Sequence, residues 1–319
     1  MYIENYLTDD DMQRAHDKSP KPPPATLLAS SYLCLLEAID IFTQESVNRI
    51  TSALIGLTPR ETVVLGLYYR SIGFCRSAIE LKSAIHQQSL TSAERSVIEL
   101  YADMELIHRD TIPHGVDKFL LFIDWQKLRA ARRMDKFFAD NPDLDTKPSH
   151  ATAHREFMKR ETSRIEQEME RLWGKTKRGD LVKPEHWSGL NLHERAAKLD
   201  KTIELLVMKD YDRRNFSVHT GLTGVVNLSK ENFEAMCAFA LNLIGDCVLA
   251  ELHILGKELK LASAIKNYDE ILEELDRVQV YAFADKTLQS LGEPCRYSVC
   301  PGDPPQVIDK AGRQFQQLL

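Results

Sequence analysis

Long stretches without glycine or proline are the feature that most restricts how this chain can fold. The 319 residues include only 14 Gly and 13 Pro, and several of these lie in clusters. Between the clusters, apolar residues recur at intervals of three and four, as they do on one face of a helix. No two segments show the polar and apolar alternation of paired strands. The sequence therefore predicts an all-α fold.

The predicted helices cover most of the chain. They lie at about 25–46, 58–88, 91–108, 116–139, 149–173, 191–209, 229–255 and 264–291. Thr58 is expected to cap the second helix, because Pro59 at its first position and Glu61 at its third complete a capping box. By the same logic, Thr91 or Ser92 is expected to cap the third.

The domain organisation follows from changes in composition along the chain. Residues 1–24 are polar and end in a proline-rich stretch, which is typical of a stiff tether without a core of its own. Residues 25–260 are expected to form a helical domain with a charged helical insertion at about 140–185. Residues 261–319 are expected to add a helix and a mobile tail rich in Gly and Pro.

Composition indicates a soluble, cytoplasmic protein. Hydrophobic residues make up 43% of the chain and charged residues 28%, as in globular domains. The first ten residues lack the apolar core of a signal peptide, and no apolar run approaches the roughly 18–20 residues that span a bilayer. The six cysteines mostly lie in apolar helical patterns, which indicates free thiols in a reducing compartment. We therefore expect a cytoplasmic protein without membrane association.

Positive charge is concentrated in one segment of an acidic chain. Residues 127–178 hold fourteen Lys or Arg and nine Asp or Glu, a net charge of +5, whereas the whole chain carries −6. Such a segment can be the footprint of a polyanion. The alternative is a solvated helix held by i,i+4 ion pairs. The sequence leaves both interpretations open.

Several catalytic signatures are absent from the sequence. It has no glycine-rich phosphate loop, no GxSxG, no HExxH and no CxxC pair. His150 and His154 are spaced for one face of a helix, but no third metal ligand accompanies them. Cys295 and Cys300 lack a partner pair. We therefore expect neither a metal nor another cofactor.

One polar segment, residues 211–220, combines groups suited to phosphate chemistry. In a helix, Tyr211, Asn215 and His219 would share a face, and the long side chain of Arg214 would reach the same cavity. The glycine after this segment favours a helix end there. A guanidinium, an amide and an imidazole at a helix end together form a candidate phosphate-handling site.

The Arg214-Asn215-x3-His219 pattern resembles the Arg–polar–x3–His motif of the HEPN superfamily. These are helical-bundle proteins that include many metal-independent ribonucleases. A wider pattern accompanies the motif: a helix with Arg76 and Glu80, a Trp-containing loop at His186–Leu190, and then the 211–220 segment. This order, over about residues 60–255, is similar to that of an uncharacterised bacterial HEPN-related domain family. The resemblance implies a HEPN-like helical bundle with extra peripheral helices.

The resemblance also implies an activity and its residues. HEPN ribonucleases cleave RNA without a metal and leave a 2′,3′-cyclic phosphate. His219 would then act as general base or acid and Arg214 would stabilise the phosphorane, while Asn215 would orient the phosphate or His219. Glu80 would orient His219 or pair with Arg214. The residues expected to contact the substrate are Arg76, Tyr211, Arg213 and Ser217.

Partners follow from the same resemblance. HEPN sites usually form between two protomers, so a homodimer with the active site at its interface is expected. A toxin–antitoxin or anti-phage context would add a neutralising or activating protein. Basic residues at 129–133 or 175–178 are candidates for phosphate contacts with RNA.

An alternative function remains open, that of a non-catalytic adaptor or sensor that binds nucleotide, RNA or a protein. In that case Arg214 would form an exposed ion pair with Asp210 and His219 would stabilise a helix C-terminus. Arg76 and Glu80 would form a structural i,i+4 pair.

Overall fold

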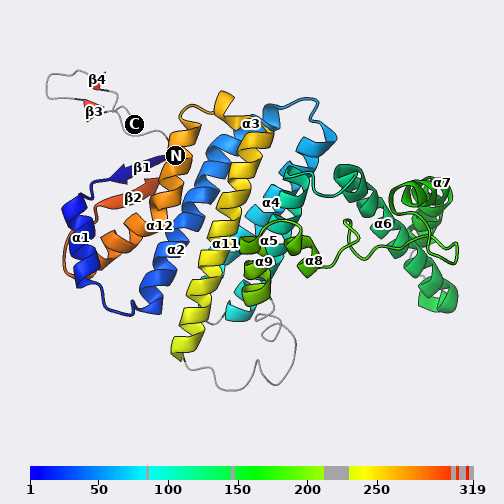
Figure 1. The fold of residues 1–319 in the computed structure, drawn as a ribbon, viewed down its shortest axis with the longest axis horizontal. Helices are drawn as coiled ribbons and strands as arrows, with labels where there is room; N and C mark the ends of the chain where they lie inside the picture. The colour runs from blue at the N-terminus through cyan, green and yellow to red at the C-terminus, as the bar shows by residue number, and fades with distance from the viewer. Residues whose placement is uncertain (84–85, 145–147, 212–229, 303–306, 309–313, 316–319) are drawn as a thin grey trace. The chain divides into compact units, whose positions relative to one another are not determined.

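The computed structural model describes residues 1–83, 86–144, 148–211, 230–302, 307–308 and 314–315. The structure is 75% helical with very little strand (Figure 1), which confirms the prediction of an all-α fold. The chain divides into two compact units. Unit 1 comprises Met1–Leu57, Leu65–Tyr101 and Lys209–Leu319, and unit 2 comprises Thr58–Val64 and Ala102–Met208. Helices α4 (Pro59–Glu80) and α5 (Gln87–His108) each contribute residues to both units.

Three long helices form the centre of unit 1. Helix α2 (Ala25–Phe42) packs against both α11 (Lys230–Glu258) and α12 (Tyr268–Ser290), and the three run side by side in Figure 1. Leu35 and Leu36 of α2 are fully buried here. Gly245 of α11 permits the close approach, because a Cβ at this position would lie 3.0 Å from Cδ2 of Leu35. A π-helical turn (Thr43–Val47) and α3 (Asn48–Ala53) continue from α2.

Two helical segments of unit 1 are long and apolar enough to cross a membrane by length and composition. They span Ala25–Ala53 and Asn232–Glu258, with mean hydropathy of 1.6 and 1.7. The prediction that no apolar run approaches this length was therefore wrong. In the second segment 67% of the apolar window is buried inside the protein, and the two segments pack against each other. A core helix of a soluble protein meets the same criteria.

Two segments far apart in the sequence form a strand pair in unit 1. Strand β1 (Tyr2–Asn5) runs antiparallel to β2 (Tyr297–Cys300), with Tyr2 opposite Cys300 and Asn5 opposite Tyr297. The prediction that no strands pair was wrong, because residues 297–300 of the predicted tail form β2. Each strand has only four residues, too few for an alternating pattern to stand out, and its partner lies at the other end of the sequence.

Helix α1 (Asp9–Lys18) corrects the prediction of a tether without a core. Its Ala15 packs against Ala284 and Leu288 of α12, with Leu7 and Met12 beside them. The first 24 residues therefore contribute to the packing of unit 1.

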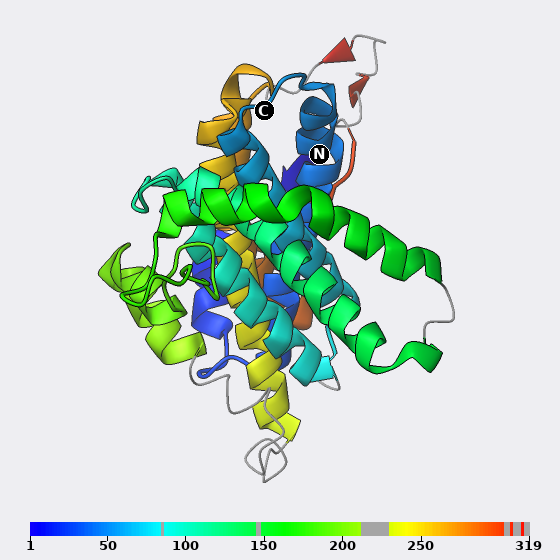
Figure 2. The same ribbon diagram turned by 90° about the vertical axis from the view of Figure 1, so that its right-hand side faces the viewer.

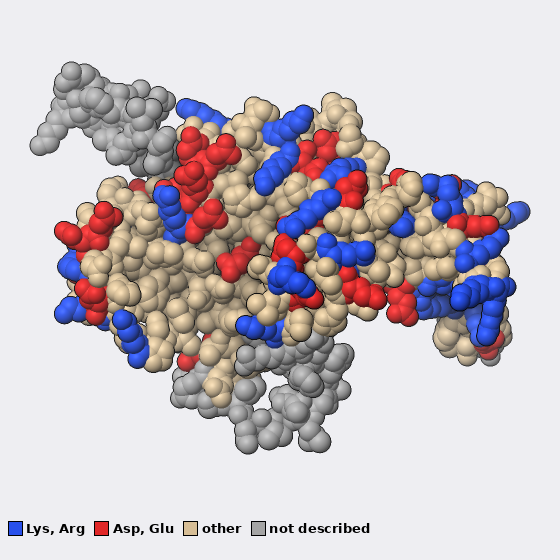
Figure 3. Space-filling model, viewed as in Figure 1, with Lys and Arg blue, Asp and Glu red and all other residues tan. Residues whose placement is uncertain are grey.

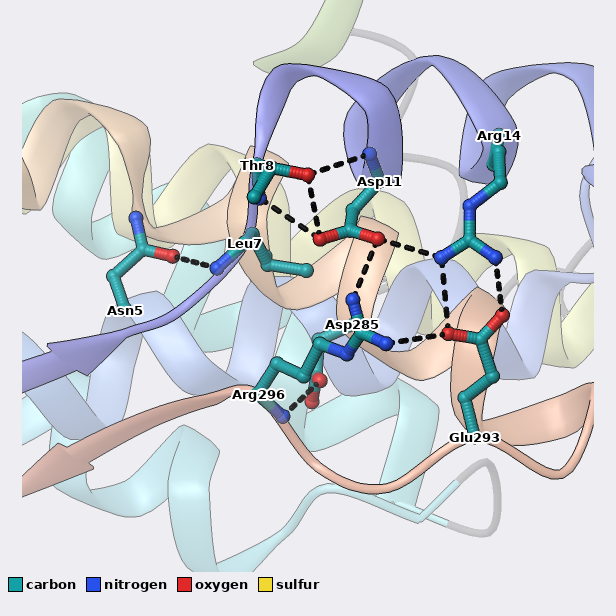
Figure 4. A network of polar contacts seen from close by, with 8 residues as sticks. All are labelled: Asn5, Leu7, Thr8, Asp11, Arg14, Asp285, Glu293 and Arg296. Atoms are coloured by element: carbon teal, nitrogen blue, oxygen red, sulfur yellow. Dashed lines mark hydrogen bonds and ion pairs between the residues drawn. The ribbon is translucent and has the colours of Figure 1, made fainter.

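A polar network reinforces this contact (Figure 4). The Thr8 hydroxyl donates to Asp11 at 2.8 Å, and Arg14 pairs with Glu293 at 2.9 Å. Arg296 reaches across from the start of β2 and pairs with Asp11 at 2.6 Å. Hydrogen bonds from the backbone and hydroxyl of Thr8, and then from Arg14, hold the pKa of Asp11 well below its usual range. The network therefore joins α1 to the segment between α12 and β2.

The predicted capping box at the start of α4 is confirmed. The Glu61 N–H donates to the Thr58 hydroxyl at 3.2 Å, and the Thr58 N–H donates to the Glu61 carboxylate at 2.7 Å. Helix α4 ends at Glu80, however, and not near residue 88. Helix α5 begins at Gln87, so Thr91 and Ser92 lie inside it. Thr91 is fully buried and its hydroxyl accepts from Gln87 at 2.8 Å, which explains why it does not cap a helix.

Unit 2 contains a hairpin of two long helices, α6 (Gly115–Asp140) and α7 (Pro148–Trp173), seen in Figure 2. A short 3-10 turn, Pro142–Leu144, follows α6. Helix α7 matches the predicted charged helix closely, and its sparse apolar residues are enough to form a core with α6. That core contains Leu121, Trp125, Leu128, Ile165, Met169 and Leu172.

Two short helices follow where one was predicted. Helix α8 (Leu192–Ala197) is capped by Asn191, and α9 (Lys201–Leu206) is capped by Asp200. Asp200 accepts hydrogen bonds from the backbone N–H groups of the first turn of α9 and so caps that helix. The helical stretch is therefore interrupted between α8 and α9, earlier in the chain than the break predicted near Lys209. A π-helical turn, Val207–Tyr211, ends this part of the described chain.

Candidate functional site

The described part of the predicted site lies on the exposed face of α4. Arg76 and Glu80 are exposed on this face, whereas Ser71, Ile72 and Cys75 are buried on the opposite face. Gly66 and Gly73 also lie on the exposed face, and a Cβ at either glycine would meet no atom within 4 Å. On this face of α4, Arg76 and Glu80 therefore lie near the backbone of two glycines that no described side chain covers.

Arg76 contacts Asp40 of α2, both in unit 1. Its Nε donates to Oδ1 of Asp40 at 2.7 Å, and the arginine side chain is 47% exposed. The predicted i,i+4 pair of Arg76 with Glu80 is thus replaced by a contact between helices. A guanidinium has further N–H donors on its two terminal nitrogens, with which the half-exposed Arg76 can bind an anion.

The rest of the predicted site lies outside the described residues. This holds for Arg213, Arg214, Asn215, Ser217 and His219, and for the side chain of Tyr211. The described chain enters this segment through the π-helical turn and resumes at Lys230 with α11. The predicted grouping of Arg214 and His219 with Glu80 therefore stays a prediction.

A buried polar cluster in unit 2 holds the Trp-containing loop. Asp103 of α5 accepts a hydrogen bond from Nε2 of His186 at 3.1 Å and another from Nη1 of Arg195 at 2.5 Å. Asp103 and Arg195 are 7% and 3% exposed. Nδ1 of His186 accepts from the Ser188 backbone N–H at 3.3 Å, so we assign the ring proton to Nε2. The cluster ties the loop to both α5 and α8.

The charges of this cluster compensate one another. Burial alone would raise the pKa of Asp103, but the hydrogen bond from His186 and the charge of Arg195 outweigh it and lower the pKa below its usual value. An ionised Asp103 therefore neutralises a guanidinium that is buried beside it. Removing the Asp103 carboxylate would take a buried negative charge away from this guanidinium.

Trp187 is the apolar anchor of the same loop. Its ring is almost fully buried and packs edge-on against Phe119 of α6, with ring centroids 5.6 Å apart. Gly115 at the start of α6 lies beside it, and a Cβ there would be in ordinary contact with the indole ring, at 3.6 Å. Hence the aromatic and polar halves of the loop are both fixed within unit 2.

This cluster holds a loop and does not present a nucleophile. Ser188 lies 2.8 Å from Nδ1 of His186, an arrangement that superficially matches a serine and its base. The Ser188 hydroxyl is buried, however, and also accepts from the Leu190 backbone N–H at 3.2 Å. Its hydrogen-bonding capacity is spent inside the loop.

Sequence reasoning found the loop but missed Asp103 and Arg195. The signal that could have identified them is a charged residue at a helix position that the spacing of apolar residues assigns to the buried face. Arg195 lies at such a position with Leu192 and Ala196, both buried. Opposite charges at two such positions indicate a buried pair, although they do not indicate which charges meet.

A buried carboxyl lies beneath the inner face of α4, in unit 1. The Ser71 hydroxyl donates to Oε1 of Glu251 on α11 at 2.9 Å, and both residues are fully buried. Burial raises the pKa of Glu251 well above its usual value, with the Ser71 hydrogen bond acting weakly in the opposite direction. The second oxygen, Oε2, has no hydrogen-bond partner among the described residues.

Metal ligands do not gather in the part of the chain that the structure describes. No group of three His, Cys, Asp or Glu side chains there is placed to hold an ion. The side chain of His150 lies outside the described residues. All six cysteines are free thiols, as predicted, although Cys295 is exposed.

Comparison with known proteins identifies one family. The model of a family of unknown function (DUF5677) matches residues 61–235, more than half of the chain. The match contains nearly all of α4, the Asp103 cluster and the 211–220 segment, and it ends in the first turns of α11. No curated protein and no solved structure matches the chain.

Proposed function

The chain belongs to the DUF5677 family, and we propose that it is a metal-independent endoribonuclease of the HEPN type. The observation that carries the proposal is the Arg214-Asn215-x3-His219 sequence, which lies inside the matched residues together with Arg76 and Glu80. An all-α fold and an open face on α4 agree with such a site. In this proposal, α4 supplies one wall of the site and the 211–220 segment supplies the catalytic groups.

The proposed reaction is an internal transfer at phosphorus. His219 accepts the proton of a ribose 2′-hydroxyl while the 2′-oxygen forms a bond to phosphorus. The bond from phosphorus to the 5′-oxygen of the next nucleotide breaks, and that oxygen takes up a proton. The products are a 2′,3′-cyclic phosphate and a 5′-hydroxyl, and neither water nor a metal is consumed. An imidazole suits both proton transfers because its ordinary pKa is near neutrality.

The remaining residues have supporting roles. Arg214 neutralises the charge that accumulates on the phosphorane, for which a planar guanidinium is well shaped. Asn215 orients the phosphate or His219, and Glu80 orients His219. The contacts to the substrate come from Arg76, Tyr211, Arg213 and Ser217. Because Arg76 is already held by Asp40, little of its side-chain freedom is lost when it binds a phosphate.

The proposal includes an assembly and a setting. We propose a homodimer whose two protomers complete each other's sites, in the cytoplasm. A nuclease of this kind would belong to a toxin–antitoxin or anti-phage system and would need a neutralising or activating protein.

Growth of a bacterial host after induced expression tests the proposed setting. Wild type should arrest growth, His219→Ala should relieve the arrest at an equal protein level, and the exposed His16→Ala on α1 should not. Equal arrest by wild type and His219→Ala would contradict a catalytic role. It would favour the alternative function, a helical module that binds RNA, nucleotide or a protein.

A further inference from the structure

Most cations of the α6–α7 hairpin are neutralised by carboxylates. The side chains with an acidic partner within 4.0 Å are Lys127, Arg132, Arg155, Arg160, Arg164 and Arg171, and also Lys175 just after α7. For these residues the structure supports the second interpretation of the basic segment, a solvated surface held by ion pairs. Cations without a carboxylate partner are therefore the stronger candidates for a surface that binds a polyanion.

Three cations on the second half of α6 remain without such a partner. Arg129, Arg133 and Lys136 have no carboxylate partner among the described residues. They follow one another at i, i+4 and i+7, so they form one row along the helix. Asp140, one turn beyond Lys136, ends the row. The row covers about 10 Å at the rise of an α-helix.

The first cation of the row is held in place. The Arg129 guanidinium lies over the ring of Trp125, 5.9 Å from its centroid, and Trp125 belongs to the hairpin core. Arg133 and Lys136 are exposed. The row therefore combines a fixed charge with two that are free to adjust to a ligand.

An apolar edge runs beside the basic row. Met134 and Phe137 of α6 are 39% and 48% exposed. The Phe137 ring packs edge-on against Phe138, with centroids 5.6 Å apart, which limits its movement. These two exposed apolar side chains lie next to the basic row, where an aromatic ring is available for contact with a ligand.

We infer that this face of α6, made of Arg129, Arg133, Met134, Lys136 and Phe137 and called here the α6 ridge, binds single-stranded RNA. Sites for single strands combine cations along the phosphate backbone with an aromatic ring on which a base stacks. Lys and Arg side chains gather over the α6–α7 hairpin in Figure 3. The inference rests on the proposed function for the identity of the polyanion, and it assigns substrate binding to a surface distinct from the catalytic segment.

The test is a binding titration of full-length protein with a fluorescent single-stranded RNA in EDTA, at several salt concentrations. All proteins carry His219→Ala so that the RNA stays intact. Arg129→Ala, Arg133→Ala and Lys136→Ala are combined in one variant. The matched control combines Arg160→Ala, Arg164→Ala and Arg171→Ala, which removes the same charge from cations that have carboxylate partners. Thermal unfolding of both variants verifies that they are folded.

The ridge variant should bind at least about tenfold more weakly near 0.1 M salt. Its plot of log affinity against log salt should be shallower by about 2, because each phosphate contact contributes roughly 0.7 for a single strand. The control should change the slope much less. Phe137→Ala should weaken binding by about fivefold or more with the slope unchanged, since stacking releases no counterions.

RNA binding by the α6 ridge and RNA cleavage by the proposed site can each fail independently of the other. If the ridge and control variants bind RNA equally well, the inference that the α6 ridge binds RNA is overturned, whether or not the protein cleaves RNA. Binding of poly-glutamate but not RNA would also overturn it, because the face would then serve an acidic protein. RNA binding that is lost only in the ridge variant would support RNA binding by the α6 ridge. If wild type also never cleaves RNA, the proposed enzymatic function is contradicted while the inference about the ridge stands.

Discussion

Nε2 of His186 lies 3.1 Å from Oδ2 of Asp103, and this contact joins the Trp187 loop to α5. The other oxygen of Asp103 faces the buried guanidinium of Arg195. Both contacts lie within unit 2 and within the residues that the family shares. The loop is thus held by one ionised carboxylate, and its stability should depend on that charge.

Asp103→Asn should destabilise the protein by about 3–5 kcal/mol, because it removes the buried negative charge that both His186 and Arg195 contact. Urea unfolding followed by circular dichroism would measure this. Asp117→Asn is the control: its carboxylate is 56% exposed and lies 4.0 Å from Arg171, so the expected loss is under about 1 kcal/mol. Equal losses in the two variants would contradict the assigned role of Asp103.

Glu251→Gln should change how stability depends on pH. Burial raises the pKa of Glu251 in the folded state, so the folded protein binds a proton that the unfolded chain releases above about pH 4.3. Wild type should therefore lose stability as pH rises from about 4.3 towards the raised folded-state pKa. Unfolding midpoints at pH 5 and pH 8 should fall less with pH in Glu251→Gln than in wild type. Parallel pH profiles would mean that Glu251 is not a buried neutral acid.

Gly73→Ala should stabilise the protein by about 0.5–1 kcal/mol. Gly73 lies within α4, and a Cβ there meets no neighbouring atom, so alanine gains helix propensity without a clash. Gly256→Ala on α11 is the matched contrast. Its Cβ would lie 2.2 Å from the hydroxyl oxygen of the buried Tyr268, and a loss of about 1–3 kcal/mol is expected. Denaturant midpoints of the two variants should move in opposite directions, and a shift in the same direction would contradict the packing described.

Local signals in the sequence predicted much of the helical framework. The Thr58 capping box, the end of α5 at His108 and the bounds of α7 all follow from residues close together in the chain. Such features depend on helix periodicity and on first-turn hydrogen bonds, which a sequence displays directly. The predicted start of α5 was wrong because Thr91, which is buried inside the helix, has the sequence context of a capping residue.

Contacts between distant residues could not be predicted in the same way. The pairing of β1 with β2 and that of Arg76 with Asp40 depend on which segments meet in the folded chain. The same holds for Asp103 with His186 and Arg195. Periodicity assigns a residue to a face but does not name its partner. The roles of Arg214 and His219 remain predictions from a motif, since both lie outside the described residues.

The most direct test of the proposed function is RNA cleavage by purified protein in EDTA, with wild type, Arg214→Ala and His219→Ala compared on total RNA and on tRNA. The proposal predicts fragments that end in a 2′,3′-cyclic phosphate from wild type, and their loss by several orders of magnitude in both variants. Circular dichroism should show that all three proteins are equally folded. Cleavage that persists in His219→Ala, or no cleavage by folded, dimeric wild type, would contradict the proposal.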